Sequence, residues 1–288
     1  MKTVKLRSIA VITAVALSAC GGDKTETATS TVDTTTVAEV KDTTPVTVDD
    51  VKKFKFDFAI ANIPSPVQLM NDIAAEGGTY NNSIMHDTKR AANYKTEFSK
   101  AVNLGIYDLD MGYAIAHEKG EDMMKYFKAS VTEGEALGLK SVFGEMVGRR
   151  AENNMDNKDS LLKIIDEIYV KGDDYLRTND RVQTATHIFI GSWVEAIYIV
   201  CKQAEVETDT AKKGKMYKQL WDQRFYLKNL VDLLSEFKDK KDNAWLMDEL
   251  NKIHTEINAI KDAKEIDEAK FKSIATKIYA LRSALTNK

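Results

Sequence analysis

Proline is absent from the chain beyond Pro66, and this feature restricts the fold more than any other. Proline breaks helix interiors, whereas the long remainder of this chain is rich in Ala, Leu, Lys and Glu, which favour helices. We therefore predict an all-α multi-helix bundle. The expected helices cover residues 66–76, 88–118, 121–137, 141–153, 159–178, 181–205, 210–238, 243–263 and 267–286.

The last three of these helices have the most regular apolar patterns. Apolar residues recur there at steps of three, four or seven, which is typical of helices that pack along a shared seam. With short loops between them, we expect an antiparallel three-helix bundle over residues 209–288, within an all-α body that spans 50–288. The seam residues are Leu220, Leu227, Leu234, Leu246, Leu250, Ile253, Ile257, Ile260, Phe271, Ile274, Ile278, Leu281 and Leu285.

The N-terminus has the features of an export signal. Lys2, Lys5 and Arg7 precede the apolar run 9–17, which is too short to span a bilayer. The sequence Leu-Ser-Ala-Cys at 17–20 then resembles the lipobox of bacterial lipoproteins. That resemblance implies cleavage of the signal peptide 1–19 and attachment of lipid, such as palmitate, to Cys20. The alternative is a plain secreted protein with a chance cysteine.

The segment 20–49 is predicted to be a disordered tether. It contains ten threonines and no aromatic residue, so it cannot bury enough apolar surface to offset its ordering entropy. Aromatic residues begin with the segment 54–58, where Phe alternates with Lys and Asp. We predict that this segment is an extended strap docked on the helices, with a β-strand as the alternative. Ser65 and Pro66 are expected to begin the first helix.

Two helices differ from the rest because glycines and acids interrupt their apolar sequence. Gly105, Gly112 and Gly191 would let another backbone or a ligand approach closely. At helical spacing, the first helix aligns four polar side chains on one face, and the second aligns three with Gly191. These residues are Tyr107, Asp110, Tyr113 and His117 in the first helix, and His187, Glu195 and Tyr198 in the second.

These polar stripes allow two interpretations. They could meet across a cleft as a ligand-binding pocket of carboxylates, phenols and imidazoles. Alternatively, Asp110 and Glu195 could be buried acids paired with tyrosine hydroxyls and with arginines such as Arg149, Arg150 or Arg181. We favour the second, structural interpretation. Carboxylates close together in an open pocket would support the first, and fully paired carboxylates in a closed core would support the second.

The same residues carry a family resemblance. The patterns A-x-N-x-G-x-Y-x-x-D-x-x-Y at 101–113 and G-x-W-x-E-x-x-Y at 191–198, with Pro64 and Pro66, resemble an uncharacterised family of all-helical lipoproteins from Gram-negative bacteria. The likeness covers roughly residues 60–240. It implies no activity and therefore no catalytic residues.

Composition and motifs argue against several function classes. Loss of the signal peptide changes the net charge from −3 to about −6. A chain with this negative charge lacks the basic surface that binding to nucleic acid requires. No ferritin-like, zinc-protease, phosphate-loop or hydrolase motif occurs, so we expect no cofactor, no metal and no catalytic residue. Cys201 lies in an apolar segment and is expected to be buried and inert.

We therefore predict a lipid-anchored lipoprotein of the cell envelope. Gly21 carries no acidic retention signal after Cys20, so we expect the outer membrane. The predicted role is a helical scaffold or protein-interaction module with an envelope protein as partner. The alternative is a periplasmic small-ligand or metal-binding protein that uses a polar pocket between the helices at 101–118 and 181–205.

Overall fold

The chain is described by a computed structural model that covers Asp57 and residues 66–287, apart from the side chains of Pro66, Glu145 and Met146. Over this part of the chain it contains helices and turns but no strand, which confirms the all-α prediction. The α-helices are α2 (Pro66–Ala75), α3 (Glu97–Ala116), α4 (Gly120–Ala136), α5 (Glu145–Glu152), α6 (Lys158–Thr178), α7 (Val182–Val206), α8 (Thr210–Ser235), α9 (Lys241–Asn258) and α10 (Glu268–Thr286).

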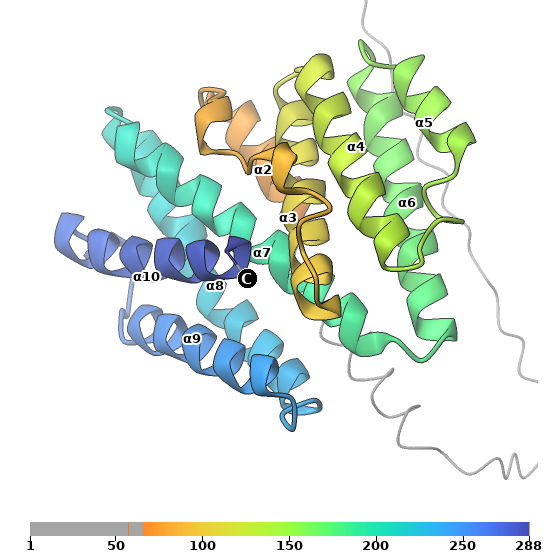
Figure 1. Cartoon of the computed structure of the whole chain (residues 1–288). Coiled ribbons are helices and arrows are strands. Elements are labelled where there is room, and N and C mark those ends of the chain that lie inside the picture. The colour runs from red at the N-terminus through yellow and green to blue at the C-terminus, as the bar shows by residue number, and fades with distance from the viewer. Residues whose placement is uncertain (1–56, 58–65, 288) are drawn as a thin grey trace, which may run out of the picture. The chain divides into compact units, whose positions relative to one another are not determined.

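Helices α3 and α7 form the centre of the fold. They pack along each other and are buried almost throughout, which is expected of helices that are apolar on every side. Helix α3 also packs against α4 and α6, while α7 also packs against α6, α8 and α10. Figure 1 shows α4, α5 and α6 on one side of α3, and α8, α9 and α10 on the other.

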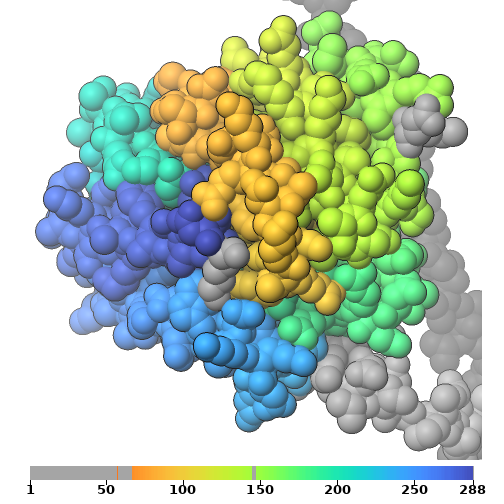
Figure 2. All heavy atoms as spheres, in the orientation of Figure 1, coloured from red at the N-terminus to blue at the C-terminus, as the bar shows by residue number. Residues whose placement is uncertain are grey.

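The segment that runs from α2 to the start of α3 covers one face of this central pair. In Figure 2 it forms the orange band between α4 on one side and α10 on the other. Its backbone is tied to the core by long-range bonds, because Asn81 N–H donates to the Tyr113 hydroxyl at 3.0 Å and Ala92 N–H donates to Glu133 Oε1 at 2.8 Å. This segment therefore closes one side of the α3–α7 pair.

The seam residues of the last three helices are all buried, as their spacing predicts. Helix α8 packs along α9, and α9 packs against α10. Helix α10 also packs against α7, and α7 packs against α8. The three helices therefore share their core with α7 rather than standing apart from the rest of the body.

The helix expected from residue 88 begins only at Glu97, so that boundary was wrong. Short 3-10 turns, η1 (Asn82–Ile84) and η2 (Thr88–Arg90), occupy the segment before it. Thr96 caps α3 through a capping box, in which its hydroxyl accepts from the Ser99 N–H and Ser99 Oγ accepts from the Thr96 N–H. The local capping chemistry fixes the start of the helix where the apolar pattern alone did not.

Several predictions for the N-terminal part concern residues outside the described range. These are the signal peptide, Cys20, the tether, Ser65 and the phenylalanines at 54–58. Asp57, the one described residue of that segment, is helical rather than extended. Its carboxylate pairs with Arg177 Nη1 on α6 at 2.7 Å.

Candidate functional site

The central helices touch at two glycines. A Cβ atom at Gly105 would overlap the carbonyl oxygen of Ile188 on α7, and one at Gly191 would overlap that of Val102 on α3. Ser192 Oγ donates to the Gly105 carbonyl at 3.0 Å and so links the two backbones. The prediction that Gly105 and Gly191 permit close packing is therefore confirmed, and the neighbour is a helix backbone rather than a ligand.

Gly112 has a looser environment. A Cβ atom there would lie 3.3 Å from Cγ2 of Val67, so this glycine lets α2 rest on α3. A side-chain methyl can shift by the few tenths of an ångström that an added Cβ needs, whereas the backbone carbonyls at Gly105 and Gly191 cannot.

Asp110 and Glu195 lie together in the core between α3, α7 and α10. Neither is exposed to solvent. Arg282 on α10 donates to both Glu195 oxygens, from Nε and from Nη2, at 2.7 Å each. The backbone N–H of His86 donates to Asp110 Oδ2 at 2.8 Å.

The two acids interact through their charges, because both are fully buried side by side. Asp110 Oδ1 has no hydrogen-bond partner among the described residues. Burial, followed by the charge of Glu195, raises the pKa of Asp110 well above its usual range, which favours its protonated form. Arg282 balances the charge of Glu195. We call Asp110, Glu195 and Arg282 the carboxylate network.

This closed arrangement, in which Arg282 pairs with Glu195 and the His86 N–H bonds Asp110, supports the structural interpretation of the polar stripes. The cation of the carboxylate network is Arg282, so the predicted choice among Arg149, Arg150 and Arg181 was wrong. Arg150 instead pairs with Glu167 at 2.7 Å, and Arg181 pairs with Glu97 at 2.7 Å. No tyrosine hydroxyl of the described chain bonds the two acids in place of the arginine.

The other stripe residues on α3 make separate contacts. The Tyr107 hydroxyl donates to the Asp87 carbonyl at 3.1 Å, and the Tyr113 hydroxyl donates to the Thr79 carbonyl at 3.1 Å. His117 caps the end of α3 and packs edge-on against Tyr113, with its pKa lowered by burial. They hold the segment before α3 against the core and do not converge on an open pocket.

The stripe on α7 is likewise divided. His187 bonds Asn243 on α9, with 2.6 Å between Nε2 and Oδ1, and burial lowers its pKa. The Tyr198 ring lies under the Arg282 guanidinium at 4.2 Å. Of the predicted stripe residues, only Asp110 and Glu195 meet.

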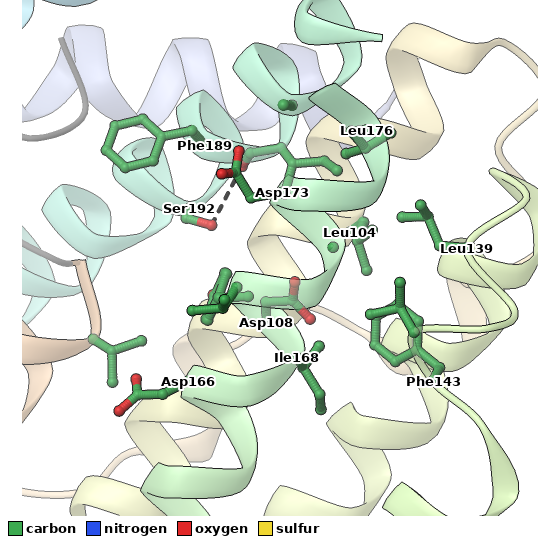
Figure 3. A pocket seen from close by; sticks show the side chains of 17 residues that line it. Leu104, Asp108, Leu139, Phe143, Asp166, Ile168, Asp173, Leu176, Phe189 and Ser192 are labelled. Carbon is green, nitrogen blue, oxygen red and sulfur yellow. Dashed lines mark hydrogen bonds between the residues drawn. The ribbon is translucent and has the colours of Figure 1, made fainter. Parts of the chain in front are cut away.

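A cavity of about 470 Å³ lies on the other side of the α3–α7 pair, between α3, α6, α7 and the turn before α5 (Figure 3). This volume falls in the range of small-molecule sites. Most of its wall is apolar. The lining residues are Val67, Leu104, Asp108, Leu139, Val142, Phe143, Asp166, Ile168, Tyr169, Val170, Gly172, Asp173, Leu176, Ala185, Ile188, Phe189 and Ser192.

Asp108 is the unusual residue of this wall. It is only 4% exposed, and its Oδ1 has no hydrogen-bond partner among the described residues. Burial raises the pKa of Asp108 to about 7, and the nearby Ser130 hydroxyl opposes this rise. Figure 3 shows its carboxyl group among the apolar side chains of the cavity. The fold thus places a buried carboxyl group, one oxygen of which has no hydrogen-bond partner among the described residues, in an apolar cavity.

Two hydroxyl groups and two further acids complete the polar part of the wall. Burial, followed by the charge of Asp108, raises the pKa of Tyr169. The neighbouring Ser192 hydroxyl opposes this rise. Asp173 pairs with Arg177 Nε at 2.9 Å, and Asp166 is exposed at the rim. No Lys, Arg or His of the described chain lines the cavity.

Sequence reasoning missed Asp108, Tyr169 and Ser192 as site residues. Asp108 stands two positions before Asp110, which puts it about 200° around the helix and therefore outside the predicted stripe. A signal was nevertheless present, because any acid inside a helix that is apolar all round must be buried. The predicted pair of helices does flank the cavity, although with different faces from those expected.

The remaining chemical features of the described chain are those of a protein interior. Helix α7 is long and apolar enough to span a membrane, but most of it is buried within the fold. Cys201 is fully buried and burial raises the pKa of its thiol, which confirms the expected inert cysteine. No cluster of three His, Cys, Asp or Glu side chains suited to a metal ion occurs among the described residues.

Comparisons with protein-family models, with curated proteins and with solved structures found no match to this chain. The resemblance to a family of helical lipoproteins therefore stays a prediction.

Proposed function

We propose that this chain is a lipid-anchored protein of the cell envelope that binds a small molecule in the cavity between α3, α6 and α7. The observation that carries the proposal is Asp108. A buried polar atom without a partner costs about 1–3 kcal/mol. Several such atoms occur in the described chain, and Asp108 Oδ1 is the one that belongs to a residue of the cavity wall. Perturbed carboxyl groups inside concave, mostly apolar cavities are typical of binding sites.

The contrast with the carboxylate network strengthens this interpretation. Arg282 pairs with Glu195 and its charge also acts on Asp110, whereas no cation of the described chain acts on Asp108. Each of the two aspartates has one oxygen without a hydrogen-bond partner, but only Asp110 has a cation beside it. A ligand that pairs with Asp108 would therefore stabilise the complex through an interaction that the protein alone does not make.

Filling the cavity tests the proposal. Gly172 on α6 lines it, and a Cβ atom there would make ordinary contact with Val142 at 3.7 Å. Gly172→Phe should therefore place a ring in the cavity without a backbone clash. Gly214→Phe on α8 is the matched control, because a Cβ atom at Gly214 has nothing within 4 Å.

The assay is fluorescence titration with N-phenyl-1-naphthylamine, a neutral apolar probe. The chain carries Cys20→Ser, so that no lipid and no detergent are present. Gly172→Phe should weaken probe binding more than about tenfold, or about 1.4 kcal/mol, while the Gly214 variant matches the parent. Absence of binding to the parent, or equal binding by the two variants, would contradict the cavity as the site.

Attachment through Cys20 is supported by the sequence alone. With the original chain, Cys20→Ser should release the protein from the membrane fraction and abolish labelling with an alkyne fatty acid. Retention of both would end the lipoprotein assignment. Native mass spectrometry of the chain recovered from its own envelope would separate the binding function from the predicted scaffold role, since a retained small mass supports the former and a retained protein supports the latter.

A further inference from the structure

We infer that the molecule bound between α3, α6 and α7 is an organic ammonium ion with an apolar body, whose N–H group donates to Asp108. This inference rests on the proposed function and names the class of ligand. It follows from three properties of the cavity, which are the charge of its wall, the missing donor at Asp108 and the apolar surface around them.

The charge of the wall selects a cation. Three carboxyl groups line the cavity, on Asp108, Asp166 and Asp173, and no basic side chain of the described chain does. Arg177 lies beside the wall, but Asp173 and Asp57 take up its charge at 2.9 Å and 2.7 Å. An anionic ligand would meet uncompensated negative charge, whereas a cation would be attracted into the cavity.

The free oxygen of Asp108 selects a hydrogen-bond donor. Its Oδ1 has no partner, and the groups near the carboxyl are the hydroxyls of Ser130 and Tyr169. A protonated primary or secondary amine would supply a charge-assisted hydrogen bond, roughly twice as strong as a neutral one. A quaternary ammonium ion has no N–H and would leave Oδ1 unsatisfied.

The surrounding surface selects an apolar body. Leu104, Ile168 and Leu176 are nearly fully buried, and the rings of Phe143 and Phe189 face the same space (Figure 3). Each methylene that leaves water against such a surface contributes about 0.8 kcal/mol. A bare metal ion fits poorly, because it needs several oxygen ligands and no cluster of three suitable side chains occurs in the described part.

Displacement of N-phenyl-1-naphthylamine from the Cys20→Ser chain tests the inference with four octyl compounds of equal chain length. These are octylammonium, octanol, octanoate and octyltrimethylammonium. At about pH 8 we expect octylammonium to displace the probe at concentrations about tenfold lower than any of the other three. The comparison with octyltrimethylammonium needs no mutation and tests the N–H donor directly.

Asp108→Asn should abolish this preference, so that octylammonium and octyltrimethylammonium displace the probe at similar concentrations. Asp110→Asn is the matched control, because it makes the same substitution two residues away, in the carboxylate network that faces away from the cavity. It should retain the preference.

The outcomes distinguish this inference from the proposed function. If the probe fails to bind the parent chain, the proposed function itself is wrong. If the probe binds and the four octyl compounds compete equally, or octanoate competes best, the cavity is a binding site but the ligand is not an ammonium ion. Equal competition by octylammonium and octyltrimethylammonium, or a preference that survives Asp108→Asn, also overturns the assignment to Asp108.

Discussion

Removing the charge of Glu195 should destabilise the fold severely. Glu195→Gln keeps the shape of the side chain but leaves the Arg282 guanidinium without its counter-charge. The Arg282 side chain is only 14% exposed, and both of its 2.7 Å bonds to Glu195 are affected. Stranding a buried charge in this way costs about 3–5 kcal/mol.

The assay is thermal unfolding followed by circular dichroism at neutral pH. In a body of this size, each kcal/mol shifts the melting temperature by about 2–4 °C, so Glu195→Gln should lower it by roughly 10 °C. Asp110→Asn should cost less than about 1 kcal/mol, because the amide has nearly the shape of the carboxyl group and, like its protonated form, carries no charge. Its carbonyl oxygen can still accept from the His86 N–H, which bonds Asp110 Oδ2 at 2.8 Å.

Adding Arg282→Met to Glu195→Gln supplies the internal control. The double variant removes the stranded charge and should recover part of the lost stability, which a double-mutant cycle measures as coupling. A Glu195→Gln chain as stable as the parent would refute the buried ion pair. A loss from Asp110→Asn as large as that from Glu195→Gln would refute the protonated state of Asp110.

Three further predictions follow from the core. Because the folded chain keeps the Asp108 proton to about pH 7 and the unfolded chain releases it near 3.8, stability should fall by up to about 4 kcal/mol between about pH 4 and pH 7. Asp108→Asn should reduce this fall in urea denaturation at about pH 5 and pH 8 by the contribution of Asp108, leaving that of the other buried acids such as Asp110. An unchanged slope would contradict the raised pKa of Asp108. Gly105→Ala should lower the free energy of unfolding by about 3 kcal/mol or more, because its Cβ atom would overlap the Ile188 carbonyl, whereas Gly214→Ala in α8 should be neutral or stabilising. Equal melting temperatures of these two variants would refute the close contact. Limited proteolysis should leave a fragment that begins between about residues 48 and 62, and a stable cut inside the body would contradict the tether.

Much of the fold could be predicted because its helices repeat apolar residues at helical spacing. The seam of α9, from Leu246 to Ile257, and that of α10, from Phe271 to Leu285, are buried as their periods require. The segment before α3 was mispredicted because its structure depends on side-chain caps at Asn81, Asp87 and Thr96. Caps of this kind act on single residues and leave no periodic signal.

The candidate site could be predicted only in part, for a different reason. Helical spacing placed Asp110 and Glu195 on the inner faces of α3 and α7, and the two acids do meet. Their cation could not be identified, since Arg282 is 87 residues from Glu195 and reaches it only through the packing of α10 on α7. Local spacing indicates which face of a helix is buried but not which distant helix covers that face.

The close contact between Gly105 and Gly191 explains why one helix pair serves two purposes. Because the backbones of α3 and α7 touch there, side chains on either side of the contact face separate environments, one covered by α10 and one by α6. Asp110 lies on the α10 side, where the charge of Arg282 acts on it and on Glu195, whereas Asp108, about 200° away, faces the cavity beside α6. The carboxylate network can therefore hold the pair rigid while Asp108 stays free to bind. Loss of the network should loosen the cavity, but loss of Asp108 should leave the network intact.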